Sequence, residues 1–287
     1  MSQTILITGA TSGIGRDTAL YLASRGHRVI GTGRNERALA ELRDAGVHAL
    51  RMDVTDDASI ASAAAQVDAI TDGYGLDVLV NNAGYGLFGP LEMLSDRDVR
   101  AQFDTNVFGL LAVTRTFLPQ MRERGAGKII NVSSVGGRLT LPLGGAYNAT
   151  KYAVESMSDA LRMEVKQFGV SVVLIEPGYI KTNFASTTVG LLKDYSAEGS
   201  PYANALAMAD DAESKLDRFA ASPRSVAKAI ERAVVSRRPR ARYVAPWING
   251  FGPWLTYLLP TSLIDWFFAR AAGLRPASTV KALPAGA

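Results

Sequence analysis

Two residues of this chain, Tyr147 and Lys151, have side chains that could exchange a proton with a substrate. They are four residues apart, so one helical turn would place them on the same face of a helix. A lysine charge beside a phenol favours the phenolate, and we expect Lys151 to lower the pKa of Tyr147 from about 10 toward neutrality. Such a tyrosine could donate a proton to a carbonyl oxygen or accept one from an alcohol. The pair alone is weak evidence, because Tyr-x-x-x-Lys is frequent by chance and is usually a solvated helix face.

The glycine-rich segment Thr8–Gly15 has the composition of a phosphate-binding turn. It follows an apolar run and opens a segment of helical periodicity, which is where a doubly wound fold binds a pyrophosphate. Its glycines would let the backbone approach the phosphates, and the helix start would supply free N–H groups. The spacing is Gly-x-x-x-Gly-x-Gly, and the residues that we expect to contact the cofactor are Gly9, Thr11, Ser12, Gly13, Ile14 and Gly15.

The end of the second expected strand indicates which dinucleotide binds. An NAD site usually has an acid there for the ribose 2′-hydroxyl, whereas this chain reads Thr32-Gly33-Arg34-Asn35. The Arg34 guanidinium could pair with a 2′-phosphate, so the sequence predicts NADP(H). The alternative is that Arg34 is only a surface charge.

The elements that would position these residues alternate along the chain. Apolar runs rich in β-branched residues predict strands at Thr4–Thr8, Arg28–Thr32, Ala49–Met52, Asp77–Asn81, Lys128–Val132, Ser171–Glu176 and Arg242–Val244. Helical periodicity occurs at Gly13–Arg25, Glu36–Ala45, Ala58–Asp72, Asp96–Arg122, Tyr147–Phe168 and Pro223–Ser236. The alternation predicts an α/β fold, a Rossmann-like doubly wound parallel sheet of about seven strands with helices on both faces.

Composition fits one globular domain and excludes several classes of site. The chain has 287 residues, 47% hydrophobic and 20% charged, with no cysteine and two histidines. Disulfides, thiolate chemistry and cysteine-bound zinc are therefore excluded, and we expect no metal site. We expect residues 1–287 to form a single domain, with a substrate-covering insertion at 185–221 and a helical and aromatic C-terminal extension at 245–287.

The charge balance predicts no nucleic-acid partner. The net charge is +4, and the basic excess lies near Arg237, Arg238, Arg240 and Arg242. We interpret this group as solvated surface, because a nucleic-acid site would need a broader basic face with interleaved aromatic residues. No signal peptide is visible at Met1-Ser2-Gln3, so a cytoplasmic location is expected.

Further motifs, in order and at matching intervals, resemble the short-chain dehydrogenase/reductase family over nearly all of residues 1–246. They include Asn81-Asn82-Ala83-Gly84 after the fourth strand, Ser134 thirteen residues before Tyr147, and Pro177-Gly178 after the sixth strand. The glycine loop and the Asn-Asn-Ala-Gly motif disfavour the family's extended, epimerase-like branch. The resemblance implies an NADP(H)-dependent oxidoreductase that interconverts a carbonyl and a secondary alcohol.

The resemblance also implies roles for single residues. Tyr147 would donate the proton, Ser134 would bind the substrate oxygen, Lys151 would bind the nicotinamide ribose as well as tune Tyr147, and Asn106 would hold a water that links Lys151 to solvent. Thr182 would hold the nicotinamide carboxamide, and Asp53 and Val54 would contact the adenine. The implied cofactor contacts beyond the glycine loop and Arg34 are Asp53, Val54, Asn82, Ala83, Gly84, Tyr147, Lys151, Pro177, Gly178, Ile180 and Thr182.

The substrate end of the chain is apolar. The segment after Thr182 includes Phe184, Val189, Leu191, Leu192 and Tyr195, which could form a lid. All three tryptophans lie in the tail 247–268, and no charged residue occurs between Arg242 and Asp265. Prolines at 246, 253 and 260 would break a membrane-spanning helix. We expect the tail to cap the substrate pocket or contact another subunit, ahead of touching a membrane surface.

The substrate prediction rests on analogy. The tail resembles that of relatives acting on steroids, retinoids or long-chain keto-lipids, so a bulky lipophilic carbonyl or alcohol is expected, in a homodimer or homotetramer. The alternatives are a 3-oxoacyl thioester reductase, a catalytically silent nucleotide-binding scaffold, and a peripheral membrane or assembly protein. The complete set of Asn106, Ser134, Tyr147 and Lys151 favours an active enzyme, because a scaffold needs none of these side chains.

Overall fold

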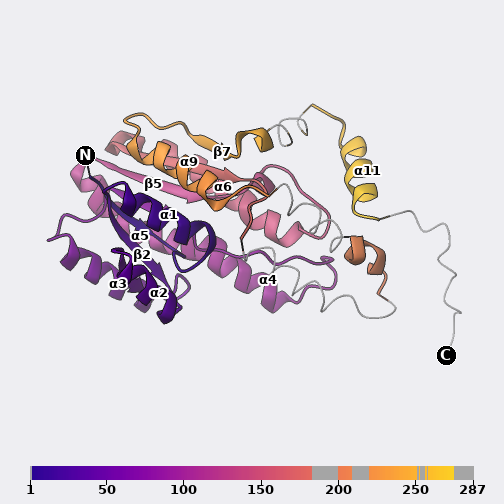
Figure 1. The fold of residues 1–287 in the computed structure, drawn as a ribbon. Helices are drawn as coiled ribbons and strands as arrows, with labels where there is room; N and C mark the ends of the chain where they lie inside the picture. Colours follow the sequence, from indigo (N-terminus) through magenta and orange to yellow (C-terminus); the bar gives the residue numbers. More distant parts are fainter. Residues whose placement is uncertain are drawn as a thin grey trace, which may run out of the picture.

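Seven parallel strands form one sheet in the order β3-β2-β1-β4-β5-β6-β7 (Figure 1). The strands are β1 (Thr4–Ile7), β2 (Arg28–Gly33), β3 (His48–Arg51), β4 (Val78–Asn81), β5 (Gly127–Val132), β6 (Val170–Pro177) and β7 (Arg242–Ala245). The order reverses between β1 and β4, which makes the sheet doubly wound. The predicted Rossmann-like α/β fold is confirmed.

This computed structural model describes residues 2–182, 200–208, 220–250, 252, 256 and 258–274 of the chain. Its longer helices are α1 (Gly13–Ser24), α2 (Glu36–Asp44), α3 (Asp57–Ile70), α4 (Asp96–Phe103), α5 (Leu110–Arg124), α6 (Gly145–Val165), α9 (Pro223–Val235) and α11 (Thr261–Ala271). The expected lid residues 184, 189, 191, 192 and 195 lie outside the described residues. No helix in the described part of the chain is long and apolar enough to cross a membrane.

Two apolar layers hold the helices against the two faces of the sheet. Ile5 and Ile7 of β1 belong to one buried cluster, which they share with residues of α1, α2 and α9. Leu6 points to the other face and belongs to a second cluster, which includes residues of α3 and α5. Successive side chains of a strand alternate between its faces, so strands buried on both sides must be apolar throughout. This is the pattern from which the sheet was predicted.

The helix expected at Asp96–Arg122 is interrupted in the structure. A π-helical turn, Asp104–Gly109, separates α4 from α5 and contains the buried residue Asn106. A single π turn inserted between α-helical segments occurs frequently at functional sites. The side chain of Asn106 makes the tertiary contacts described below, and these account for a turn that helical periodicity alone would not predict.

Candidate active site

The glycine loop joins β1 to α1 in a conformation that only small residues fit. Gly9 and Gly13 have φ angles of +66° and +52°, in the left-handed region. A Cβ atom on Gly15 would overlap the carbonyl oxygen of Gly9 and the side-chain amide of Asn82. The side chain of Ser12, at the start of α1, makes no capping hydrogen bond. The loop therefore presents a helix N-terminus behind a close-fitting backbone turn, which suits a pyrophosphate.

Asn82 and Thr8 brace this loop against the end of β4. The Thr8 hydroxyl accepts hydrogen bonds from the backbone N–H groups of Asn82 and Ala83, each at 2.9 Å. The Asn82 side-chain amide donates to the carbonyl oxygens of Thr8 at 2.9 Å and Gly9 at 3.2 Å. The predicted residues Asn82 and Ala83 thus lie beside the loop, and Asn82 has a bracing role there.

Arg34 follows β2 at the same edge of the sheet. Its side chain is 75% exposed and forms an ion pair of 3.4 Å with Asp53. Burial acts to raise the pKa of Asp53, but hydrogen bonds from Thr55 and the charge of Arg34 outweigh it and lower that pKa. An added Cβ on Gly33 would overlap Thr11, so the loop also touches the end of β2. The remaining predicted adenine contact, Val54, is 8% exposed.

The segments after β6 face the glycine loop. The backbone N–H of Gly178 donates to the carbonyl oxygen of Ala245 at 3.0 Å, and Ile180 is 7% exposed and pairs with Ala221. Side-chain atoms of Thr182 lie 3.5 Å from the position that a Cβ on Gly13 would take. Thr182 therefore stands opposite the start of α1, at the carboxyl end of the sheet.

Ser134 and Tyr147 meet beside a tight turn. The Ser134 hydroxyl accepts a hydrogen bond from the Gly136 N–H at 3.0 Å and also hydrogen-bonds with Tyr147. The Tyr147 ring stacks on Phe88 with 5.2 Å between the ring centroids. Asn148, which is buried, donates to the carbonyl oxygen of Gly136 at 2.7 Å and so holds the turn against α6.

Lys151 is buried one helical turn after Tyr147. Its ammonium nitrogen donates to the carbonyl oxygen of Val132 at 3.0 Å and lies 5.8 Å from the centroid of the Tyr147 ring. Burial lowers the pKa of Lys151 to about 8, against an opposing effect of the Glu155 charge. The predicted shared face of Tyr147 and Lys151 is therefore present.

The expected lowering of the Tyr147 pKa is wrong for this structure. Tyr147 keeps part of its surface accessible, but protein atoms surround it densely, and this desolvation raises its pKa to about 12. The hydrogen bond with Ser134 opposes the shift without cancelling it. Burial therefore sets the direction of the shift, while the hydrogen bond to Val132 holds the lysine nitrogen 5.8 Å from the ring centroid. The phenol is thus protonated at neutral pH.

Asn106 ties the π turn to the end of β4 and to α6. Its side-chain oxygen accepts from the Tyr85 N–H at 3.0 Å, and its amide donates to the Tyr85 carbonyl oxygen at 2.9 Å and to the Thr150 hydroxyl at 3.1 Å. A Cβ on Gly84 would lie 2.9 Å from the Asn106 oxygen and 3.8 Å from the Lys151 nitrogen. The Asn106 oxygen and the Lys151 nitrogen therefore both lie close to Gly84.

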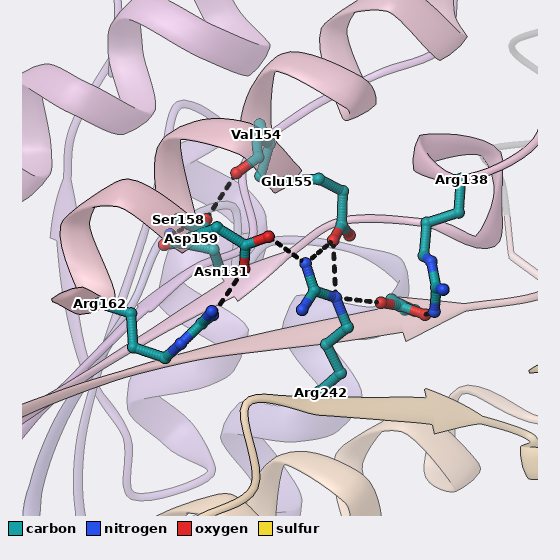
Figure 2. Close-up of polar contacts among 9 residues, drawn as sticks. Asn131, Arg138, Val154, Glu155, Ser158, Asp159, Arg162 and Arg242 are labelled. Atoms are coloured by element: carbon teal, nitrogen blue, oxygen red, sulfur yellow. Dashed lines mark hydrogen bonds and ion pairs between the residues drawn. The ribbon is translucent and has the colours of Figure 1, made fainter.

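Arg242 is not the solvated surface residue that its neighbours suggested. Its side chain is 29% exposed and lies within 3.1 Å of a Glu155 oxygen and 2.6 Å of an Asp159 oxygen, both on α6 (Figure 2). Its Nε lies 3.1 Å from Glu176, which is fully buried at the end of β6. The other three members of that basic group, Arg237, Arg238 and Arg240, are exposed. The partners come from distant segments, so no local pattern could indicate them.

The C-terminal helix α11 stands away from the sheet in Figure 1 and forms one wall of a cavity of about 300 Å³. The wall residues from this part of the chain are Thr256, Ile264, Asp265 and Phe268, opposite Arg138, Leu139, Thr140 and Tyr152. Other large side chains of this region, Trp247, Leu263, Trp266 and Phe267, are exposed. Described residues of the tail thus lie across this cavity from the segment after Ser134, while other described residues of the tail are exposed.

Known proteins similar to this chain are oxidoreductases. The family model for short chain dehydrogenase matches residues 3–189. The chain is 35% identical to an uncharacterized oxidoreductase, YbbO, of Escherichia coli K12 over 92% of this chain and 93% of the relative. It is 37% identical to a 3-ketodihydrosphingosine reductase of Bacteroides thetaiotaomicron, covering 84% and 86% of the two chains. It is 36% identical to human retinol dehydrogenase 16, covering 91% and 86%.

Solved structures agree with the family model. A short-chain dehydrogenase from Streptomyces avermitilis superimposes with a TM-score of 0.76 at 33% identity, over 94% of this chain and 97% of the other. A serine dehydrogenase complexed with NADP+ gives 0.73 at 31% identity, over 84% and 93%. A short-chain dehydrogenase/reductase from Burkholderia phymatum in complex with NAD gives 0.75 at 28% identity, over 97% and 98%. With the fold, the glycine loop and the relatives in agreement, this chain belongs to the short-chain dehydrogenase/reductase family.

Proposed function

We propose that this protein is an NADP(H)-dependent carbonyl reductase or alcohol dehydrogenase, with Asn106, Ser134, Tyr147 and Lys151 as its catalytic residues. The observation that carries the proposal is the junction of Ser134 and Tyr147, whose hydroxyl groups are hydrogen-bonded beside the carboxyl end of the sheet. Two hydroxyl donors at one point can bind the oxygen of one carbonyl group, as carbonyl reduction requires. The nicotinamide cofactor, when bound, supplies the hydride.

The chain's own residues account for the proton that carbonyl reduction needs. Tyr147 is protonated at neutral pH, since its pKa is raised to about 12 by burial, and it can donate to an oxygen that gains negative charge. Ser134 donates a hydrogen bond to the same oxygen and stabilises the growing charge. Lys151, charged below about pH 8, provides a cation on this face of α6. Asn106 fixes the π turn beside Lys151.

NADP(H) is proposed over NAD(H) because of Arg34. Its exposed guanidinium lies at the end of β2, where an acid would favour the ribose 2′-hydroxyl. The glycine loop and the start of α1 fit either dinucleotide. Of the solved relatives, one is in complex with NADP+ and another with NAD. The cofactor preference of this chain therefore depends on Arg34 and its ion pair with Asp53.

The substrate proposed is a bulky lipophilic ketone or its alcohol. Two of the named relatives are a 3-ketodihydrosphingosine reductase and a retinol dehydrogenase, whose names indicate long or isoprenoid apolar substrates. The cavity beside the segment after Ser134 includes Leu139, Ile264 and Phe268, which suits such a molecule. We further propose a single domain, an oligomer of two or four copies, and a cytoplasmic location.

The test is a substrate panel assayed with both cofactors. Purified protein is mixed with NADPH or NADH and with steroid, retinoid, long-chain keto-lipid and 3-oxoacyl thioester carbonyls, and cofactor oxidation is followed by absorbance. We expect NADPH to be oxidised with lipophilic ketones, at higher kcat/KM than with short ketones. Turnover of the thioester alone would favour the alternative reductase. Cofactor binding without any turnover would favour a nucleotide-binding scaffold, and a strong NADH preference would contradict the assignment of Arg34.

A further inference from the structure

Six charged side chains form a cluster that includes Glu155 and Asp159, which continue along α6 the four-residue spacing of Tyr147 and Lys151. Three are acids, Glu155, Asp159 and Glu176, and three are bases, Arg138, Arg162 and Arg242 (Figure 2). Arg138 lies 3.6 Å from Glu176, and Arg162 lies 2.6 Å from Asp159. Arg242 contacts all three acids. The mechanism proposed above uses none of these side chains, although two of the acids are more than nine-tenths buried.

The cluster connects the segments that carry the proposed catalytic residues. Glu176 directly precedes Pro177, whose carbonyl oxygen accepts a hydrogen bond from Ser134 at 3.5 Å. Arg138 ends the short turn that begins at Ser134. Glu155 and Asp159 lie on α6, beyond Lys151. One guanidinium, that of Arg242, therefore joins α6 to the end of β6, where the Ser134 segment also lies.

Glu155 is the member of the cluster placed closest to Lys151 along α6. It follows Lys151 by one helical turn and is 6% exposed. A Cβ added to Gly137 would lie 2.9 Å from Glu155 Cγ and 3.0 Å from the Lys151 carbonyl oxygen. The turn after Ser134 thus packs on the helical turn that links Lys151 to Glu155, against the Lys151 backbone and the Glu155 side chain.

The charge of Glu155 acts on the protonation of Lys151. Burial lowers the pKa of Lys151, and the Glu155 carboxylate acts in the opposite direction. Burial raises the pKa of Glu155 to about 7, with a smaller contribution from Glu176, whereas a hydrogen bond with Ser133 and the Arg242 guanidinium act to lower it. The groups facing this pair are Glu176 from β6, Arg242 from β7, and Asp159 from α6 itself, with Arg138 beyond Glu176.

We propose that Glu155 is a positioning residue of the active site, whose carboxylate, fixed by Arg242, keeps Lys151 in its ammonium form. The effect of Glu155 on Lys151 is independent of the function proposed above. Only the importance of the Lys151 ammonium group for turnover rests on that function. A purely structural cluster would stabilise the fold without controlling Lys151. The difference between the two can be measured, because Asp159 contacts the same guanidinium but lies one helical turn further from Lys151.

The experiment compares Glu155→Gln with Asp159→Asn as its matched control. Lysine labelled with 13C at Cε is incorporated, and the Lys151 signal is assigned by its absence from Lys151→Arg protein. Its titration midpoint is then read by NMR in each folded variant. We expect Glu155→Gln to move the midpoint by about one pH unit toward acid, a roughly tenfold weaker hold on the proton, since a nearby carboxylate has been removed. Asp159→Asn should leave the midpoint close to that of the wild type.

Further variants keep the test decisive. Glu155→Asp retains the carboxylate and should return the midpoint most of the way to the wild-type value. If Glu155→Gln does not fold, Arg242→Gln takes its place, because Glu155 without its cation is protonated in the neutral range and the Lys151 midpoint should again move toward acid. An unchanged midpoint in the folded Glu155 or Arg242 variant, or equal shifts in Glu155→Gln and Asp159→Asn, would overturn the proposal.

The NMR measurement separates this proposal from the proposed function. It requires no turnover, so an inactive protein with the expected midpoints would reject the reductase assignment and leave the Glu155 assignment standing. In an active protein, the alkaline limb of kcat/KM should move toward acid in Glu155→Gln by the same amount as the midpoint. If the Lys151 titration midpoint moves but the alkaline fall of kcat/KM stays at the same pH, the role of Glu155 in the active site is overturned.

Discussion

The ammonium group of Lys151 lies 5.8 Å from the centroid of the Tyr147 ring and donates its hydrogen bond to Val132. The lysine is therefore placed as a charge on the face of the tyrosine, anchored to the end of β5. Burial affects both groups but in opposite directions, raising the pKa of Tyr147 to about 12 and lowering that of Lys151 to about 8. Within the neutral range, Lys151 is the member of the pair that titrates.

The first prediction is that the loss of the Lys151 proton makes kcat/KM fall at alkaline pH. As pH rises through about 8 the ammonium group loses its proton, while Tyr147 keeps its own. We expect kcat/KM for carbonyl reduction to be level on the acid side of that value and to fall above it. Cofactor affinity, measured by fluorescence, should fall over the same range, and Lys151→Arg should lack this fall because a guanidinium stays charged. A wild-type limb near pH 10 would contradict the prediction.

The second prediction concerns Tyr147→Phe. Loss of the proton donor should lower kcat by about 10²- to 10⁴-fold, whereas cofactor affinity should change little because the ring and its stacking on Phe88 are retained. The control is Tyr74→Phe, in the segment before β4, whose side chain is 53% exposed. Turnover by Tyr147→Phe at a rate close to that of the control would show that another group donates the proton.

The third prediction concerns cofactor choice. Arg34→Ala should raise the KM for NADPH by about tenfold, equivalent to about 1.4 kcal/mol, and leave the KM for NADH nearly unchanged. Arg37→Ala is the matched control, since Arg37 is an exposed arginine on the nearby helix α2 that pairs with Glu41 at 3.5 Å. Equal changes for the two cofactors would mean that Arg34 does not recognise the 2′-phosphate.

The fourth prediction is a stability effect of Asn106. The residue is 1% exposed and its side chain makes three hydrogen bonds, two of them to the backbone of Tyr85. Asn106→Ala leaves the Tyr85 N–H without this acceptor and removes two further bonds, although the Tyr85 carbonyl oxygen still accepts from Gln102 at 3.2 Å. We expect the free energy of unfolding to fall by about 2–3 kcal/mol in urea titrations. Thr150→Val removes only one of the three contacts and should cost about 1 kcal/mol. Similar losses in both variants would argue against the Tyr85 contacts as the main source.

The sequence predicted the sheet and the position of most site residues for one physical reason. The central strands are buried on both faces and consist mainly of apolar residues, and each predicted strand agrees with the structure to within one or two residues. In a parallel sheet the carboxyl ends of the strands meet at one edge. Residues that follow strands, such as Gly9, Asn82, Ser134 and Gly178, therefore come together without any knowledge of their contacts.

The features that the sequence did not predict depend on contacts between distant segments. The π turn at Asp104–Gly109 lies within a continuous helical pattern, and the side-chain contacts of Asn106 run to Tyr85 and Thr150. Arg242 stands among three exposed arginines, and its carboxylate partners lie on α6 and β6. The direction of the Tyr147 pKa follows from the density of protein around the ring. Local spacing contains no information on any of these.

Because Arg242 lies late in the chain, the charge cluster can be completed only after β7 has been translated. Glu155, Asp159 and Glu176 are translated well before β7, the last strand of the sheet to leave the ribosome. A nascent chain that ends before β7 already has Arg138 beside Glu176 and Arg162 beside Asp159, but it lacks Arg242, the cation that contacts all three acids. The loss is largest for Glu155, because a buried acid without its cation is costly. The β1–β6 portion therefore cannot complete the charge cluster during translation, and the seventh strand finishes both the sheet and the cluster.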